Sequence, residues 1–538
     1  KMYTYAYDAA GRLVRYTDHT RNEQYTYLYT PTGLLHSTQI SDLGEAHTYR
    51  TNWCRYDKEN RIEEQRYSFE FGAQRAASGL YTFTYSFGYY EQDESHHQDE
   101  YLNAVTASAD GAGKQYHVSI RRDDLMRLSG KTINLRDAGN HSAFVTNQVT
   151  YTYLDGANGS TTGLVKSYQT LINGSGTTYN LTYDVNGNIT SVSRGNYLIV
   201  RYAYDDLGQL VREDNREKNY TYYYTYDKAG NILYKEAFQL TINEGDSLSG
   251  KTPVYTNVYT YGNANWGDLL TSYKGHTITY DAIGNPLTYY GRTSYTFTWK
   301  NGRQLATATA NGKSLSFTYD DQGMRLTKTV DGVTHTYSLD GDRIVAEEWG
   351  NQLLVYFYDD AGLPMGMMYR NSSYADKQFD YYLYEKDVFG NIIAIYNASG
   401  TKVASYCYDA WGNCTVLTNV NGVGTMNPFR YRGYYLDTET NLYYLQSRYY
   451  DSYEGRIINA DDAGNLGIGY ELLSYNLIGY CANNPVMGYD PTGTWPKWLD
   501  KFVDKAKNVW NNVCQTAEQV AEFMNDAKDI ILSNIEIS

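Results

Sequence analysis

The stretch YTYAYDAAGRLVRY, residues 3–16, contains the unit from which most of this chain is built. Its first three tyrosines alternate with other residues, so their side chains share one face of a strand. Asp8 can accept backbone N–H groups at the start of a turn, and Gly11 supplies the positive φ that closes it. The pattern predicts a β-hairpin with a four-residue loop.

The same order of Tyr-Asp, two residues, Gly, one further residue and an aliphatic residue recurs along the chain. Clear copies start at Tyr183, Tyr204, Tyr226, Tyr280, Tyr319, Tyr358 and Tyr408, and weaker ones at Tyr29, Tyr56, Trp299, Ser338 and Asp387. Such self-similarity indicates an array whose hairpins bury their faces against their neighbours. We therefore expect an all-β protein in which residues 1–426 form one repeat domain.

Composition agrees with broad sheets. Tyrosine favours strands, and its hydroxyl needs a partner or water when it is buried. The 62 tyrosines, against 14 phenylalanines, therefore indicate sheets with aromatic faces and wet edges. The net charge of −15 argues against nucleic-acid binding by this chain, because an acidic surface repels phosphate.

The repeat region contains no GxGxxG, HExxH or GxSxG motif. Five scattered cysteines form neither a disulfide framework nor a zinc site, although Cys407 and Cys414 flank one turn and could pair across it. His96 and His97 lie among carboxylates, where a solvated acidic loop is favoured over a metal site. We expect no metal and no cofactor.

Residues 427–495 differ from the repeats. They open NPFRYRGYYLDTETNLYYLQSRYYDSYEGRIINADD and close NNPVMGYDPTGTW. Aromatic and polar residues alternate and break at turn residues, which predicts short strands. Two aspartates, Asp461 and Asp490, stand near the point where composition changes, so chemistry is sought here.

Together these residues resemble the RHS/YD-repeat family. The hairpins match its repeat, and Arg430–Gly493, with its Tyr-Cys-x-Asn-Asn-Pro-Val and Asp-Pro-Thr-Gly elements, resembles the family's RHS-associated core. The resemblance covers about 490 of the 538 positions. It implies hairpins joined edge to edge into one continuous sheet that spirals into a hollow shell, with the core segment coiling inward to plug one end.

In bacterial polymorphic toxins and toxin complexes of this family, the shell holds a C-terminal toxin that the core frees as an aspartyl autoprotease. The resemblance assigns the two catalytic carboxylates to Asp461 and Asp490. One carboxyl of such a pair keeps its proton and acts as the acid, while the other activates water. The cut is expected at Thr494–Trp495 or, less favourably because a proline follows, at Trp495–Pro496.

The chain departs from the family pattern in three places. Asp462 replaces a proline, so either Asp461 or Asp462 could be the partner of Asp490. The interval of 29 residues from Asp461 to Asp490 is longer than usual, with GNLGIGYEL inserted. Thr494 replaces a leucine. Without cleavage, both aspartates would simply cap turns, as Asp-Pro commonly does.

Four further residues are candidates for a supporting role. Pro491 and Gly493 belong to the Asp-Pro-Thr-Gly element itself. Arg448 and Arg456 either pair with the aspartates or stack on tyrosines, and we favour stacking.

From Lys497 to Ser538 the chain contains no glycine, proline or tyrosine. Apolar residues recur at steps of three and four, which predicts an amphipathic helix or a broken pair of helices. The segment 496–538 is short for an enzyme, so we expect the start of a toxin, a linker or an anchor helix.

Two functions follow from these patterns. The first is the shell of a secreted bacterial toxin that encapsulates a C-terminal effector and cleaves only itself. Its partners would be that effector, an immunity protein, and an N-terminal shell portion or delivery component, since Lys1 lies inside a repeat. The second is a cell-surface or cell-wall adhesion module, as in teneurins, whose exposed tyrosines bind glycans without catalysis. Burial of the tyrosines distinguishes the two.

Overall fold

Antiparallel strands dominate the computed structural model. It describes residues 3–44, 48–70, 80–89, 102–109, 111, 113–156, 160–243, 247–375, 378–466, 472–494 and 497–498. Within these ranges the only α-helix is α1 (Val423–Met426), and no helix there is long and apolar enough to cross a membrane. The predicted all-β fold is confirmed.

The first sheet has 21 described strands, and each strand pairs with the next one along the chain. Its members are β1 (Tyr3–Tyr7), β2 (Leu13–Asp18), β3 (Glu23–Tyr29), β4 (Leu35–Asp42), β5 (Thr48–Tyr56), β6 (Ile62–Glu70), β7 (Leu80–Tyr89), β8 (Leu102–Ala109), β9 (Lys114–Arg122), β10 (Leu128–Asp137), β11 (Ala143–Asp155), β12 (Thr161–Ile172), β13 (Ser175–Tyr183), β14 (Ile189–Arg194), β15 (Tyr197–Tyr204), β16 (Leu210–Asn215), β17 (Tyr220–Tyr226), β18 (Ile232–Gln239), β19 (Tyr255–Thr260), β20 (Ser272–Tyr273) and β21 (His276–Thr277).

A second sheet of 14 described strands continues the array in the same hairpin order. It contains β22 (Thr279–Tyr280), β23 (Pro286–Tyr290), β24 (Ser294–Lys300), β25 (Gln304–Ala310), β26 (Lys313–Tyr319), β27 (Arg325–Val330), β28 (Val333–Asp340), β29 (Arg343–Trp349), β30 (Gln352–Tyr358), β31 (Pro364–Asn371), β32 (Asp380–Lys386), β33 (Ile392–Asn397), β34 (Lys402–Tyr408) and β35 (Cys414–Asn419). The two sheets adjoin at Ile278, which lies between β21 and β22; its N–H donates to Thr271 O (2.9 Å) and so extends the β20–β21 pairing.

The repeated turn has the predicted chemistry. In the first copy Asp8 Oδ1 accepts the N–H groups of Ala10 (2.9 Å) and Arg12 (3.0 Å), and Gly11 has φ +79°. The loop has five residues, 8–12, which is one more than predicted. Strand pairing ends at Tyr7 and resumes at Leu13.

The tyrosine that precedes a repeat turn anchors the preceding hairpin, in strict and weaker copies of the repeat alike. Tyr29 Oη donates to Leu13 O at 2.8 Å, and Tyr204 Oη donates to Ile189 O at 2.7 Å. The acceptor in both cases is the aliphatic residue that follows the previous turn. This bond explains why the repeat uses tyrosine, since phenylalanine would leave that carbonyl without its donor.

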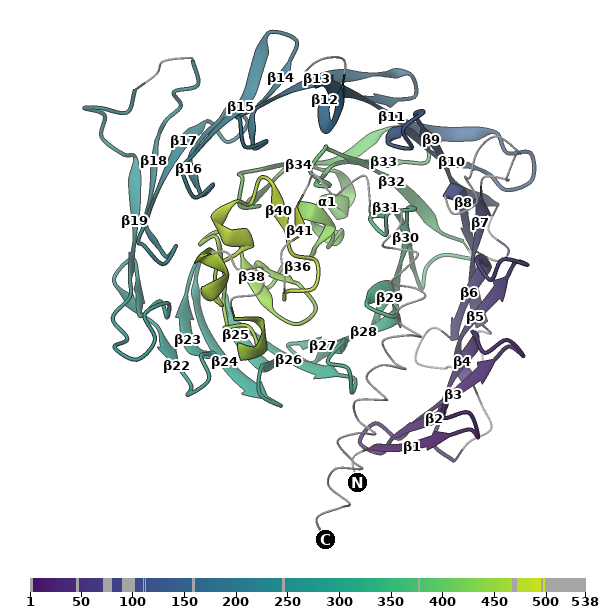
Figure 1. The fold of residues 1–538 in the computed structure, drawn as a ribbon. Coiled ribbons are helices and arrows are strands. Elements are labelled where there is room, and N and C mark those ends of the chain that lie inside the picture. Colours follow the sequence, from purple (N-terminus) through teal and green to yellow (C-terminus); the bar gives the residue numbers. More distant parts are fainter. Residues whose placement is uncertain are drawn as a thin grey trace.

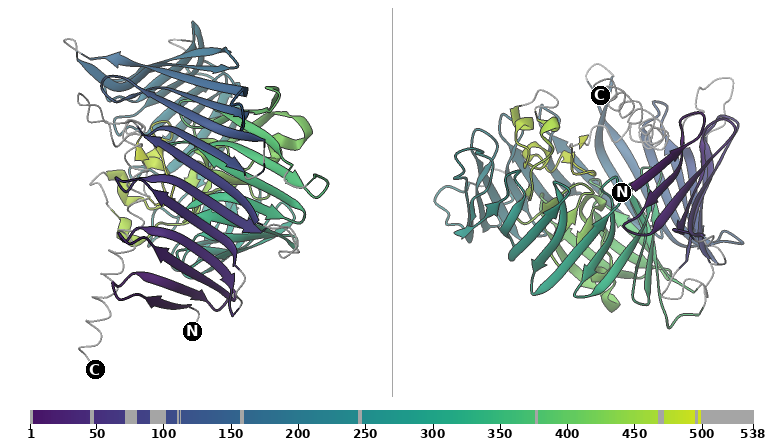
Figure 2. Two further views of the ribbon diagram at one scale, coloured as in Figure 1. Left: turned by 90° about the vertical axis from the view of Figure 1, so that its right-hand side faces the viewer. Right: turned by 90° about the horizontal axis from the view of Figure 1, so that it is seen from below.

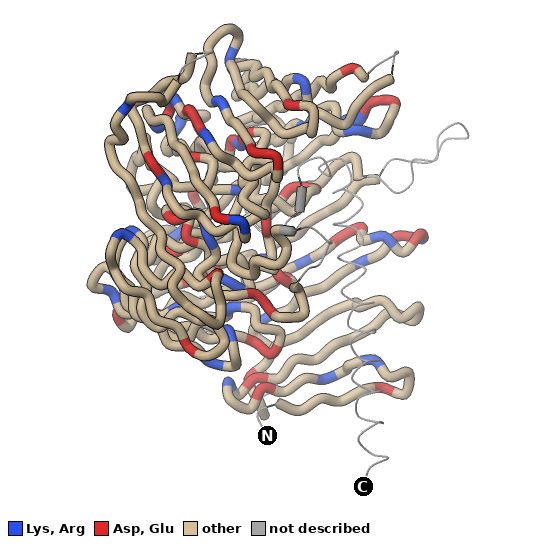
Figure 3. The backbone as a smooth tube through the Cα atoms, turned by 60° about the vertical axis from the view of Figure 1, so that its left-hand side comes forward, with Lys and Arg blue, Asp and Glu red and all other residues tan. Residues whose placement is uncertain are grey.

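The two sheets form a spiral whose second turn lies inside the first (Figure 1), and Figure 2 shows the tilted strands of successive hairpins side by side. The walls meet through buried contacts between residues far apart in the sequence. Tyr116 Oη donates to Met367 O (2.9 Å) and Tyr382 O (2.8 Å), and Asn147 Nδ2 donates to Tyr384 O (3.1 Å). Charged residues of both signs are spread over the walls (Figure 3).

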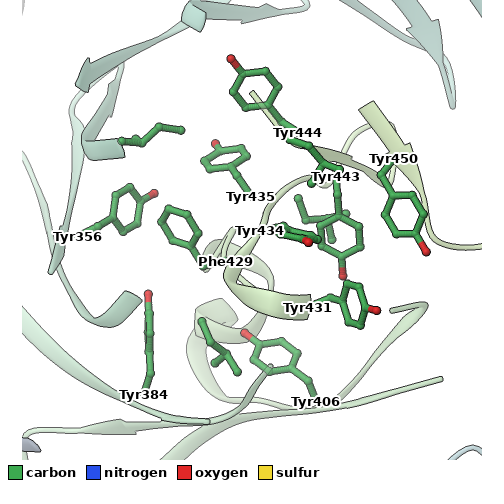
Figure 4. Packing of buried hydrophobic residues seen from close by; sticks show 14 of the residues in the cluster. Tyr356, Tyr384, Tyr406, Phe429, Tyr431, Tyr434, Tyr435, Tyr443, Tyr444 and Tyr450 are labelled. Carbon is green, nitrogen blue, oxygen red and sulfur yellow. The ribbon is translucent and has the colours of Figure 1, made fainter. Parts of the chain in front are cut away.

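Residues 427–494, here called the core segment, coil inside the spiral (Figure 1). They form a small sheet of β36 (Tyr435–Asp437), β37 (Leu442–Tyr444), β38 (Tyr449–Asp451) and β39 (Arg456–Ile457), followed by β40 (Gly488–Tyr489). Figure 4 shows its tyrosines packed among one another and against Tyr356, Tyr384 and Tyr406 of the inner wall. Most of the apolar core is thus aromatic and shared between shell and core segment.

The start of the expected helix is corrected, and the open question of a disulfide is answered. Lys497–Trp498 form strand β41, not helix, because their backbone pairs with β40; residues 499–538, including the rest of the predicted helix, lie outside the described residues. Cys407 and Cys414 are free thiols, because Cys407 pairs with Thr415 and Cys414 with Tyr408 across the ladder. His96 and His97 also lie outside the described residues.

Candidate functional site

Asp490 follows β40 and organises the Asp-Pro-Thr-Gly turn. Its Oδ1 accepts the N–H groups of Gly493 (2.9 Å) and Thr494 (3.2 Å), while its own N–H donates to Tyr434 Oη (2.6 Å). Gly493 has φ +73°, and a Cβ there would lie 2.7 Å from Leu445 O, so only glycine fits. The turn therefore brings the chain just before the expected cut against a buried carboxyl.

Asp461 reaches the same place from the other side of the core segment. Its Oδ1 accepts Asp462 N–H (2.7 Å) and Asn465 Nδ2 (2.9 Å), and its own N–H donates to Leu477 O (3.0 Å). The side chain is 6% exposed. These contacts fix a buried carboxylate that faces inward.

Asp462, the alternative partner, points elsewhere. It is exposed and caps the 3-10 turn Ala463–Asn465 by accepting Gly464 N–H (2.8 Å). The structure thus places Asp461, and not Asp462, with Asp490.

Arg448 joins the two carboxylates. Its Nη2 lies 3.1 Å from Asp461 Oδ2 and 3.6 Å from Asp490 Oδ2, and the residue is only 5% exposed. Its other nitrogens donate to backbone carbonyls, Nη1 to Leu477 O (2.8 Å) and Nε to Gly493 O. The expectation that Arg448 stacks on tyrosine is wrong, since its fork geometry suits two carboxylates and two carbonyls better.

Arg456, by contrast, stacks as expected. Its guanidinium lies 5.2 Å from the ring centroid of Tyr261 and donates to the hydroxyl of that residue (2.5 Å) and to Asp268 O (2.9 Å). It ties the core segment to the shell wall, away from the two aspartates.

Burial sets the electrostatics of the site. It raises the pKa of Asp490 above the ordinary aspartate value; Arg448 opposes this shift and the nearby Asp461 adds to it. Burial also lowers the pKa of Arg448, against the pull of both carboxylates. Two acidic groups that share one cation favour a state in which one of them keeps its proton.

The described residues on both sides of the expected cut are held, those on the C-terminal side by the pairing of β41 with β40. Ser447 donates through both N (3.2 Å) and Oγ (2.6 Å) to Thr492 O, and the hydroxyls of Thr492 and Thr494 lie 2.9 Å apart. Pro491 begins the turn, where its fixed φ suits the geometry. Trp495 and Pro496 lie outside the described residues.

Two neighbours escaped sequence reasoning. Tyr434 Oη, which receives the Asp490 N–H, also lies 3.0 Å from Tyr480 Oη, but nothing marks it among 62 tyrosines. Cys481 is buried, and burial followed by the charge of Asp490 raises the pKa of its thiol. The Tyr-Cys-x-Asn-Asn-Pro-Val element was the signal that could have directed attention to both Tyr480 and Cys481.

Residues 133–485 match the Teneurin YD-shell family. The chain belongs to this family. The RHS/YD shell that the repeats predicted is confirmed, and with it the fold shared by toxin-complex and polymorphic-toxin shells.

Two curated relatives are toxins or nucleases by name. The tRNA nuclease WapA of Bacillus subtilis is 34% identical over 307 residues, which cover 55% of this chain and 12% of WapA. The toxin protein Tse5 of Pseudomonas aeruginosa is 26% identical over 363 residues, 58% of this chain and 26% of Tse5. The chain therefore spans a small part of these relatives.

The solved structure of TcdB2-TccC3-Cdc42 shares the fold, with a TM-score of 0.56 at 16% identity. The match covers 94% of this chain and 28% of that one. At this identity the likeness concerns the fold alone.

Proposed function

We propose that this chain is the shell and core segment of a secreted bacterial polymorphic toxin. The shell would enclose a C-terminal effector, and the core segment would free that effector by cutting its own chain at Thr494–Trp495. An N-terminal shell portion or delivery component and an immunity protein would complete the system.

One observation carries this proposal: Arg448 bridges Asp461 and Asp490 in a buried site directly beside Thr494. Turn capping alone would require neither a shared buried cation nor a second aspartate from another element. The toxin relatives and the shell fold support the same assignment.

The chemistry is hydrolysis of one peptide bond. Asp461, which already accepts three donors, takes a proton from a water molecule whose oxygen attacks the Thr494 carbonyl carbon. Asp490, whose pKa is raised, gives its proton to the Trp495 nitrogen as the C–N bond breaks. The products are a Thr494 carboxyl group and a free Trp495 amine.

Three isosteric variants test the assignment. Asp490→Asn and Asp461→Asn should each abolish self-cleavage, measured as the loss of full-length chain over days on a denaturing gel. Asp462→Asn is the matched control and should cleave at the natural rate. Cleavage that persists in Asp490→Asn would remove the site from consideration.

The adhesion alternative finds less support. The tyrosines that would stack on sugars are largely buried in the shared aromatic core, and only a few of the described tyrosines, among them Tyr5, Tyr197 and Tyr234, are exposed. No specific observation favours a glycan site.

A further inference from the structure

Three successive Tyr-Asp turns of the outer wall end in a residue with an amide side chain. In the turns 184–188, 205–209 and 227–231, that amide donates to the first aspartate of its own turn. The bonds are Asn188 Nδ2 to Asp184 Oδ2 (2.9 Å), Gln209 Nε2 to Asp205 Oδ2 (2.8 Å) and Asn231 Nδ2 to Asp227 Oδ2 (3.0 Å). Each amide oxygen is thereby oriented away from its own turn as an acceptor.

Each of these oxygens receives one asparagine of the core segment. The bonds are Asn484 Nδ2 to Asn188 Oδ1 (3.0 Å), Asn483 Nδ2 to Gln209 Oε1 (2.9 Å) and Asn476 Nδ2 to Asn231 Oδ1 (2.9 Å). Asn483 Nδ2 also donates to Gly230 O (2.6 Å). Three asparagines thus contact three successive repeats, one for each turn.

Other turns end differently and lack this acceptor. Arg12 closes the first turn, donates from Nε to Asp8 Oδ2 (2.8 Å) and lies over the Tyr29 ring at 4.7 Å. Arg61 and Arg127 do the same over Tyr89 (4.4 Å) and Tyr153 (4.2 Å). A guanidinium has donors only, so an arginine-closed turn offers nothing to an asparagine amide.

An asparagine at the end of a turn does not always bind an asparagine of the core segment. Asn285 also bonds its own Asp281, but it donates to Gly302 O (2.8 Å) and receives no asparagine in the described ranges. The core asparagines therefore select three neighbouring turns and not every turn of the amide type.

The docked asparagines lead directly to the candidate site. Asn476 precedes Leu477, whose carbonyl accepts both Asp461 N–H (3.0 Å) and Arg448 Nη1 (2.8 Å). Asn484 accepts Gly488 N–H at its backbone oxygen (2.9 Å), and β40 (Gly488–Tyr489) leads directly to Asp490. The contact that Asn476 makes with the shell thus positions Asp461, and the contact that Asn484 makes positions Asp490.

The backbone between them is strained. Cys481, Ala482 and Asn483 have φ of +50°, +49° and +59°, left-handed values that are rare for three consecutive residues other than glycine. Such a conformation persists only where its surroundings determine it. The two bonds from Asn483 to the shell are well placed to do so.

We propose that Asn476, Asn483 and Asn484 are positioning residues. They set the register of the core segment on the shell by donating hydrogen bonds to turns that end in asparagine or glutamine. Their effect on catalysis rests on the proposed self-cleavage, whereas the docking itself does not.

The test converts a turn that ends in an amide side chain into one that ends in arginine. Gln209→Arg should preserve the turn, because arginine ends three other turns of this kind. It replaces the acceptor of the Asn483 amide with a group that can only donate. It should lower the self-cleavage rate constant at least tenfold and raise amide hydrogen exchange in residues 473–490 at least tenfold. Gln209→Asn keeps an amide oxygen for Asn483, as Asn188 and Asn231 do for their own partners, and should leave both quantities within threefold of the natural chain. Arg12→Gln, in a turn remote from the core segment, is the matched control and should change neither.

Natural exchange protection of residues 473–490 in Gln209→Arg would overturn the docking. A loss of the same size in Gln209→Asn would also overturn it, because that variant keeps both the turn type and the acceptor. If the natural chain never cleaves, the proposed function fails, but the exchange measurements still decide the docking.

Discussion

Arg448 is the residue on which the charge balance of the candidate site depends. It is the cation between Asp461 and Asp490, and it also holds Gly493 O and Leu477 O. Removing one member of a buried ionic group leaves the others uncompensated, which costs about 3–5 kcal/mol.

Arg448→Leu should therefore lower the free energy of unfolding by about 3–5 kcal/mol at neutral pH, measured by urea denaturation in an uncleaved background. The loss should shrink at acidic pH, where Asp490, whose pKa is raised, becomes protonated. Arg456→Leu removes a stacked arginine of the same size and should show no such recovery in acid. A pH-independent loss in Arg448→Leu would contradict the bridge.

The hairpin is the element at which a single hydroxyl matters most. Tyr204 Oη donates to Ile189 O at 2.7 Å, so Tyr204→Phe leaves that carbonyl without its donor. The expected loss of stability is about 1 kcal/mol, measured as the urea midpoint at constant slope. Tyr223 is 39% exposed, and Tyr223→Phe should stay within about 0.5 kcal/mol of the natural chain. If Tyr204→Phe loses no more stability than Tyr223→Phe, the hydroxyl bond contributes nothing, and packing of the aromatic ring would explain the tyrosine.

The sequence was sufficient to predict the hairpin but not its anchoring. Asp8 and Gly11 carry a local turn signal, because an aspartate carboxylate and a positive φ act within a few residues. The bond from Tyr204 to Ile189 crosses to the preceding repeat, and no local pattern states which carbonyl a tyrosine will meet.

The candidate site was predictable only through the family resemblance. Asp461 and Asp490 come from different segments of the core, 29 residues apart, and are brought together by tertiary packing. The same packing gave Arg448 a pairing role where stacking was expected, and it separated Asp462 from Asp490. The docking of Asn483 on Gln209 joins residues 274 positions apart, beyond the reach of local patterns.

The whole molecule depends on how the second turn of the spiral is held inside the first. At one such contact the buried Glu213 accepts Ala410 N–H (2.9 Å), and Lys235 lies 3.3 Å from Asp409. Burial and the neighbouring Asp409 raise the pKa of Glu213 to about 8. The protonated acid fits this place between the walls better than its charged form.

Because the folded pKa is raised from the model-compound value of 4.5 to about 8, the protonated glutamic acid favours the folded state. Its contribution is complete below about pH 4.5 and is lost as the pH rises through 8. The melting temperature should therefore fall between about pH 4.5 and about pH 8, and Glu213→Gln should reduce that fall. An unchanged decline over this range in Glu213→Gln would show that other groups control it.

The central claim is that the core segment cuts its own chain beside Asp490, and intact-protein mass spectrometry tests it most directly. The full chain should be followed over several days at acidic and neutral pH. The account predicts two fragments that meet between Thr494 and Trp495, and none in Asp490→Asn. A chain that keeps its full mass under every condition would contradict the claim.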